Sequence, residues 1–97
     1  MRVVTYRHIK EFIVKHTDSR TALNDWYLRT TKASWYKLSD VKKTFNSIDY
    51  VGNERFVFNI KGNQYRLVAI IIFASQKVYI RFIGTHSDYE KTDCKTI

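Results

Sequence analysis

The apolar stretch between residues 56 and 89 is interrupted by side chains that could bind or cleave a phosphodiester. They are cations, an amide and proton-transfer groups: Lys61, Asn63, Arg66, Arg81, His86 and Tyr89. A charge buried in a sheet without a partner costs several kcal/mol, so these cations require an anionic partner. A phosphate group fits, because cations hold it while histidine and tyrosine donate or accept protons.

Arg66 is the most informative of these residues. It is the only charge between Tyr65 and Phe73, a stretch otherwise suited to the centre of a sheet. A guanidinium keeps its charge at low dielectric and can grip a phosphate with two parallel hydrogen bonds. An ion pair with Asp49 or Glu54 explains Arg66 equally well. The residue alone does not separate these two interpretations.

Three further residues can extend a cationic site around Arg66. Lys61 and Asn63 lie in the turn expected before its strand, and Arg81 lies on the strand expected after it. Lys61 and Asn63 are by themselves ordinary turn residues. Arg81 joins the site only if the strand register places it on the same face as Arg66. We assign all three to substrate binding.

His86 and Tyr89 are the candidates for proton transfer and stacking. Histidine titrates near neutrality, and His86 lies between an expected strand end and a helix start, whose amides favour an anion. A tyrosine can stack on a base or hydrogen-bond to a phosphate or ribose. His86 read alone is an ordinary polar loop residue, and Tyr89 read alone packs a helix on the sheet. Their proximity to Arg66 favours the chemical roles, so we assign His86, Arg66 and Tyr89 as catalytic.

Cleavage of RNA without a metal or cofactor fits this set of residues. The ribose 2′-hydroxyl is an internal nucleophile, so the protein needs only a base, an acid and cations for the developing charge. DNA lacks this hydroxyl and is expected to stay intact. Paired carboxylates, metal-ligand spacings and glycine-rich phosphate loops are absent from the sequence. These absences argue against glycosidases, metalloenzymes and nucleotide hydrolases.

Composition supports a nucleic-acid partner. The 97 residues carry a formal charge of +8, which attracts polyanions, although such a charge can also serve solubility alone. Length, the lack of proline and the lack of a linker predict one domain spanning residues 1–97. Cys94 is the only cysteine, and no apolar run is long enough for a membrane span or a signal peptide. We therefore expect a protein of a reducing cytosol.

The expected elements place helices before strands. Amphipathic spacing predicts a helix around Ile9 to Ile13, a second capped by Asp18 or Ser19, and a short third capped by Ser39. Short strands are expected at residues 2–5 and 48–51, and alternation predicts a meander of strands at 55–60, 65–73 and 78–83. Gly84 would end the last strand, with Ser87 and Glu90 as the capping box of a final helix. This is an α+β class: helices on one face of a twisted antiparallel sheet.

Three segments of the chain resemble the HigB-type toxins of bacterial type II toxin-antitoxin systems, within the RelE/ParE superfamily. They are ASWYKLSDVKKTF with IDYV (33–51), FVFNIKGNQYRLVA (56–69) and KVYIRFIGTHSDYEKTD (77–93). The resemblance implies a RelE-like fold and a ribosome-dependent endoribonuclease that cuts translated mRNA. It also implies a cognate HigA-like helix-turn-helix antitoxin, through which the toxin meets DNA only indirectly.

The resemblance also bears on single residues. Arg66 matches the central-strand arginine that RelE-type toxins use at the scissile phosphate, and GTHSDY (84–89) is similar to the C-terminal active-site motif containing His86 and Tyr89. Val57 and Asn59 stand where RelE-type enzymes have two lysines, so the general base is not assigned. Two alternatives remain: a noncatalytic RNA- or ribosome-binding module, and a ParE-like toxin that poisons gyrase.

Overall fold

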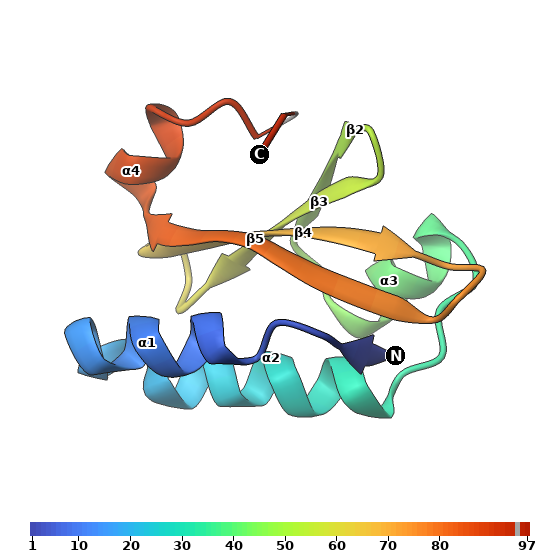
Figure 1. Cartoon of the computed structure of the whole chain (residues 1–97), viewed down its shortest axis with the longest axis horizontal. Helices are drawn as coiled ribbons and strands as arrows, with labels where there is room; N and C mark the ends of the chain where they lie inside the picture. Colours follow the sequence, from blue (N-terminus) through green and yellow to red (C-terminus); the bar gives the residue numbers. More distant parts are fainter. Residues whose placement is uncertain (95) are drawn as a thin grey trace.

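The structure is a computed structural model that describes residues 1–94, 96 and 97. Its elements follow the chain in the order shown in Figure 1: β1 (Arg2–Val3), α1 (Arg7–Lys15), the 3₁₀ turn η1 (Thr17–Ser19), α2 (Arg20–Lys32), α3 (Leu38–Thr44), β2 (Ile48–Gly52), β3 (Arg55–Ile60), β4 (Tyr65–Ile72), β5 (Lys77–Thr85) and α4 (His86–Glu90). The α+β class predicted from the sequence is confirmed.

The five strands form one sheet in the order β1-β5-β4-β3-β2. The strands β2 to β5 are antiparallel neighbours joined by consecutive hairpins. Of these, the meander of β3, β4 and β5 was predicted from the alternating sequence. The edge strand β1 instead runs parallel to β5, with Arg2 opposite Lys77. The sheet is therefore mixed rather than purely antiparallel. Its one parallel pair among the described residues is formed by β1, which precedes the helices, and β5, which follows them.

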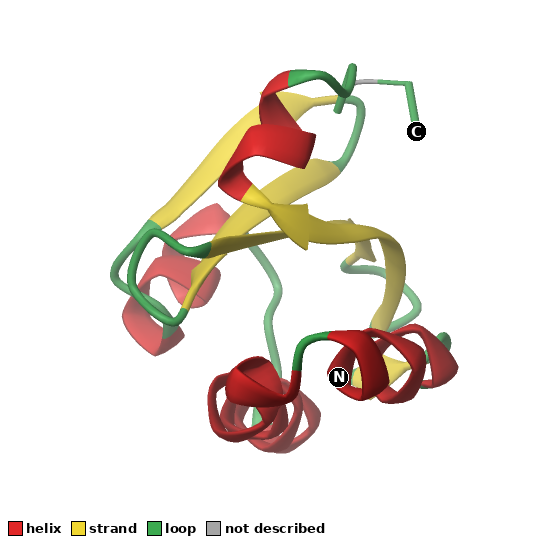
Figure 2. Ribbon diagram, turned by 90° about the vertical axis from the view of Figure 1, so that its left-hand side faces the viewer, coloured by secondary structure: helices red, strands yellow, loops and turns green. Residues whose placement is uncertain are grey.

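The helices α1 and α2 cover one face of the sheet, whereas α4 lies on the other side (Figures 1 and 2). The face toward α1 and α2 holds the core, in which Trp26 and Trp35 are both 1% exposed. Strand residues of alternate parity point into this core, among them Phe56, Phe58 and Leu67. The intervening residues point to the opposite side, which we call the outer face.

The outer face is defined by residues that alternate with the core positions of the central strands. On β3 these are Arg55, Val57 and Asn59, and on β4 they are Arg66 and Val68. Val57 and Val68 lie opposite each other and are nearly fully buried although they are outside the core cluster. The outer face thus has a small apolar floor with polar residues around it.

Two helix caps differ from the sequence prediction. Ser19 precedes α2, but its hydroxyl donates to the carbonyl oxygen of His16 at 2.6 Å and caps no amide of the helix. Ser39 lies inside α3, which begins at Leu38, and Asp40 accepts a hydrogen bond from the Tyr36 amide. Both helices are stabilised by packing of Leu23, Trp26 and Val41 rather than by the predicted caps.

The strand β5 ends later than predicted, at Thr85 instead of before Gly84. The strand continues through Gly84 to Thr85, because Gly84 pairs with Arg66 and Thr85 with Tyr65. The capping box is formed by Thr85 and Asp88, two residues before the predicted pair. The Thr85 hydroxyl accepts a hydrogen bond from the Asp88 amide at 3.1 Å, and the Asp88 carboxylate accepts one from the Thr85 amide at 3.3 Å. His86 is therefore the first residue of α4.

In the part of the chain that the structure describes, no helix is long and apolar enough to cross a membrane.

Candidate active site

The outer face presents Arg66 at the centre of the sheet. In the register, Arg66 pairs with Asn59 on β3 and with Gly84 on β5, so these three positions form one row across the strands. The Arg66 guanidinium is half-buried and donates to the carbonyl oxygens of Asn63 and Tyr65 at 3.2 and 3.3 Å. The ion pairs found among the described residues do not include Arg66. The alternative of an ion pair with Asp49 or Glu54 is therefore wrong.

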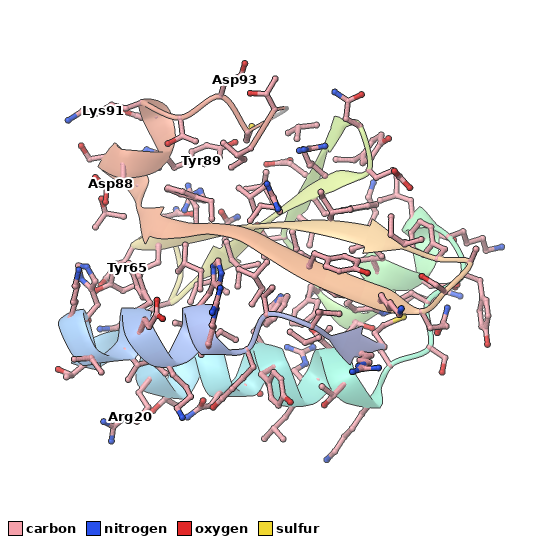
Figure 3. All side chains as sticks on the ribbon, in the orientation of Figure 1. Arg20, Tyr65, Asp88, Tyr89, Lys91 and Asp93 are labelled. Atoms are coloured by element: carbon pink, nitrogen blue, oxygen red, sulfur yellow. The ribbon has the colours of Figure 1, made fainter. Side chains whose placement is uncertain are left out.

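Tyr89 covers the Arg66 guanidinium from α4. The guanidinium carbon lies 5.9 Å from the centre of the Tyr89 ring, a cation–π distance. Figure 3 shows Tyr89 on the sheet side of α4. Burial raises the pKa of Tyr89, helped by its contact with Cys94 and by the charge of Asp49, while Arg66 acts in the opposite direction. The Tyr89 hydroxyl is thus protonated at neutral pH and can donate a hydrogen bond.

His86 belongs to the same short helix as Tyr89. The two residues are three positions apart in α4 and therefore lie on neighbouring parts of its surface. The imidazole Nε2 lies 2.9 Å from Oε1 of Glu90, and both side chains are about half exposed or more. The His86 amide donates to the carbonyl oxygen of Gln64 at 3.2 Å, which ties the start of α4 to the turn before β4.

Lys61 is held on the opposite side of the sheet from Arg66. Its ammonium pairs with Asp18 at 2.9 Å, and the same carboxylate accepts from the Tyr65 hydroxyl at 2.5 Å. The hydrogen bond from Tyr65, followed by that from Lys61, lowers the pKa of Asp18. The structure therefore places Lys61 in a contact between the 3₁₀ turn η1 and the sheet, away from the outer face.

The side chains of Arg81 and Asn63 were expected to extend the cationic site around Arg66, and among the described residues the structure gives neither a side-chain contact with Arg66. The pairing of β4 with β5 shifts between Val68 and Ala69, which face Phe82 and Ile80, so Arg81 is skipped in the register. Its side chain is exposed. Asn63 is exposed in the β3–β4 turn and contacts Arg66 through its carbonyl oxygen.

The arrangement can hold an anion and move a proton. Arg66 supplies a permanent charge, Tyr89 a ring and a hydroxyl donor, and His86 an imidazole oriented by a carboxylate. Among the described residues, no group of three or more His, Cys, Asp or Glu side chains is close enough to hold a metal ion.

Comparison with known families places this site in context. Residues 19–92 match the model of the HigB_toxin family, described as the RelE-like toxic component of a toxin-antitoxin system. The chain belongs to the HigB toxin family. The resemblance seen in the three sequence segments is thereby confirmed. Because a HigB-family toxin is one component of a toxin-antitoxin system, its family implies an antitoxin as partner.

Curated relatives agree with the family match over nearly the whole chain. The mRNA interferase toxin HigB of Escherichia coli K12 is 33% identical over 93 residues, which cover 93% of this chain and 88% of the relative. The mRNA interferase HigB of Shigella flexneri has the same identity and coverage. A more distant mRNA interferase HigB from Escherichia coli O6:H1 is 22% identical over 93 residues.

Sequence reasoning did not anticipate the contacts of three residues around the candidate site of this HigB-family toxin. Glu90 orients His86, Asp49 acts electrostatically on Tyr89, and the Cys94 sulfur lies 3.8 Å from the Tyr89 hydroxyl. Glu90 could have been found, because it follows His86 by four residues on an expected helix. Asp49 was considered from the sequence only as a partner of Arg66. The proximity of Asp49 and Cys94 to Tyr89 could not be foreseen, because it depends on how β2 and the residues after α4 lie over the outer face.

Proposed function

We propose that this HigB-family toxin is a metal-independent endoribonuclease that cleaves mRNA on the ribosome and thereby inhibits translation. The proposal rests on family membership and on the relatives' names as mRNA interferases. The observation that carries it is the position of Arg66, a half-buried guanidinium beneath Tyr89 that is part of none of the ion pairs of the described residues. A cation in this state is free to bind a phosphate.

In the proposed reaction, the ribose 2′-hydroxyl attacks the adjacent phosphate. The O2′–P bond forms and the P–O5′ bond breaks, leaving a cyclic phosphate and a free 5′-hydroxyl, so no further reactant is needed. Arg66 stabilises the charge that develops on the phosphate oxygens. The 2′-hydroxyl loses its proton as O2′ attacks, and O5′ gains one as it leaves. His86, oriented by Glu90, carries out one of these two transfers, and Tyr89 stacks on a base or donates to the phosphate. DNA lacks the nucleophile and is left intact.

The remaining assigned residues have secondary roles in this proposal. Asn63 and Arg81 contact the RNA on either side of the scissile phosphate. Lys61 is tied to Asp18 and is given no part in the chemistry. The general base remains unassigned, because Val57 and Asn59 occupy the outer face of β3 where lysines would be expected.

The proposed setting is the bacterial cytoplasm, where translated mRNA and the ribosome are found. The proposed partner is a cognate HigA-like antitoxin with a helix-turn-helix, which would connect the toxin indirectly to DNA. The charge of +8 supports a polyanionic target of the toxin itself.

Expression from a tightly controlled promoter tests the proposal. Brief induction of the wild-type protein should arrest growth and create new mRNA 5′ ends, whereas His86→Ala and Arg66→Ala should reduce both effects at least tenfold. Arg20→Ala is a matched control, because Arg20 is exposed at the start of α2 and projects away from the sheet (Figure 3).

Three outcomes would contradict the proposal. Unchanged cleavage by both variants would show that the site is wrong. Growth arrest with intact transcripts would indicate a noncatalytic RNA- or ribosome-binding module. Arrest with gyrase-linked DNA breaks would indicate a ParE-like activity.

A further inference from the structure

A second arginine, Arg55, lies on the outer face and has no role in the reaction described above. It opens β3 and precedes Phe56, whose side chain is in the core, so alternation directs Arg55 to the outer face. Its side chain is half-buried. Like Arg66, it belongs to none of the ion pairs found among the described residues.

The hydrogen bonds of Arg55 have the geometry of anion binding. Its Nε and Nη2 atoms both donate to the main-chain oxygen of Ile97, at 2.8 and 2.6 Å. Its Nη1 atom donates to the carbonyl oxygen of Asn53 at 2.9 Å. Two donors of one guanidinium that converge on a single oxygen also suit an oxygen of a phosphate. The Asn53 contact fixes the guanidinium in this orientation.

The register separates Arg55 from Arg66 by a distance suited to two different phosphates. Arg66 faces Asn59, four residues along β3 from Arg55, which corresponds to about 13 Å at the usual rise of a strand. Between them lies the apolar floor of Val57 and Val68. The Arg66 guanidinium is hydrogen-bonded to the carbonyl oxygen of Asn63 at one end of β3, and that of Arg55 to the carbonyl oxygen of Asn53 at the other. The two groups therefore point apart, and one strand of RNA crossing Val57 and Val68 can contact both.

The segment after α4 lies over the same face. Figure 1 shows it returning from α4 above the sheet toward β2 and β3, on the side away from α1 and α2. The contact between Ile97 and Arg55 joins this segment to β3. The oxygen of Ile97 therefore occupies the position that a phosphate oxygen would take.

From these contacts we infer that Arg55 is a second phosphate-binding residue of this toxin, which holds the RNA strand at a phosphate away from the scissile one. The Ile97 oxygen occupies Arg55 in the absence of RNA and is displaced when RNA binds. Arg55 is a binding residue and takes no part in proton transfer. The inference rests on the proposed function, because it takes RNA as the ligand.

Binding to a short single-stranded RNA tests the inference separately from cleavage. The probe is a fluorescent RNA with 2′-O-methyl riboses, which cannot be cut, and its anisotropy is measured over a series of salt concentrations. Arg55→Ala should weaken binding about tenfold and make the slope of log K against log salt shallower by about 0.7, the value for one phosphate contact on a single strand. Arg55→Lys should retain the wild-type slope, because it keeps the charge.

Arg20→Ala is the matched control, since it removes the same charge from the helix side of the molecule (Figure 3). It should change affinity less than twofold. Equal affinity and slope for Arg55→Ala and Arg20→Ala would overturn the inference, as would failure of the wild-type protein to bind the probe. Urea unfolding of each variant verifies that the fold is intact, and Arg55→Lys provides the comparison if Arg55→Ala is unfolded.

A truncated chain lacking Thr96 and Ile97 tests the displacement. It should bind the probe two- to fivefold more tightly than wild type, and the gain should vanish when Arg55→Ala is added. Weaker or unchanged binding by the truncated chain would overturn the role of Ile97. Intact mRNA in the induction experiment, together with normal binding here, would instead contradict the proposed cleavage and leave Arg55 as a binding residue.

Discussion

At the scale of single residues, the contact between Arg66 and Tyr89 is the centre of the proposed site. The ring lies over the guanidinium, and burial raises the pKa of the Tyr89 hydroxyl. Arg66 could be singled out from the sequence, because a lone charge in an apolar strand is visible there. Tyr89 could be named but not placed, because its position depends on where α4 begins.

Two substitutions of Tyr89 separate its ring from its hydroxyl. Tyr89→Phe keeps the ring over Arg66 and should retain mRNA cleavage within about threefold if stacking is the main role. Tyr89→Ala removes the ring and should reduce cleavage at least tenfold. Rates of cleavage in a purified translation reaction measure the difference. Equal loss in both variants would show that the hydroxyl, rather than the ring, is required.

Asp18 predicts a pH dependence of stability on the other side of the sheet. Hydrogen bonds from Tyr65 and Lys61 lower its pKa below the ordinary value of 3.8. A carboxylate with a lowered folded pKa stabilises the fold above its unfolded pKa, and this contribution is lost as the pH falls through the folded pKa. The free energy of unfolding should therefore decrease below about pH 4 partly through Asp18.

Urea unfolding at pH 6, 4 and 3 measures this contribution. Asp18→Asn should be less stable than wild type at pH 6, and the difference should shrink at pH 3. Asp25→Asn is the control, because Asp25 is exposed on α2 and its ion pair is with Arg29 on the same helix, at 3.6 Å. A constant difference between Asp18→Asn and wild type across this range would refute the assignment.

At the scale of elements, the junction of β5 with α4 sets the height of the helix above the sheet. Gly84 is buried in the row of Arg66, and Thr85 caps the helix immediately after it. A Cβ atom at Gly84 would lie 2.5 Å from Cζ of Phe82 and 3.1 Å from Cβ of Asp88. The glycine is therefore needed to make room for the Phe82 ring and, to a lesser extent, for α4, not for an unusual backbone angle.

Gly84→Ala should displace Phe82 or α4. Overpacking of this kind costs about 1–3 kcal/mol, and a shifted α4 would move Tyr89 and His86 away from Arg66. We expect a lower free energy of unfolding together with reduced cleavage. Ser87→Ala, an exposed change on α4, is the control for both measurements. Wild-type stability and activity in Gly84→Ala would show that the junction tolerates a side chain.

The elements themselves were largely predictable from the sequence. The hairpin strands have alternating or fully apolar patterns, and β3 has the predicted bounds of Arg55 to Ile60. The caps were less predictable. Ser19, Ser39 and Ser87 are all residue types that favour helix caps, and each was predicted as one. The capping box of α4 is instead formed by Thr85 and Asp88, because pairing of Thr85 with Tyr65 extends β5 beyond Gly84. Tertiary pairing thus overrode local preference.

At the scale of the whole molecule, the site depends on which face each strand residue occupies. Alternation along β3 and β4 places Arg66 and Asn59 on the outer face, and this could be inferred once a core face was assigned. The face of the sheet to which Arg81 belongs could not be inferred, because the register shift opposite Val68 and Ala69 interrupts the alternation of β5. The separation of Lys61 from Arg66 could not be inferred either. It follows from the ion pair of Lys61 with Asp18, which lies 43 residues earlier in the sequence.

The parallel pairing of β1 with β5 has a consequence for the order of folding. Arg2 and Val3 are synthesised before the other described strands, whereas their partners Lys77 and Val78 lie in β5, the last of these strands. Contacts between such distant segments close a long loop and slow folding. The Thr5 hydroxyl adds a hydrogen bond to the carbonyl oxygen of Ile80, across 75 residues. A nascent chain therefore cannot close this edge of its sheet, or position α4 after β5, until β5 has left the ribosome.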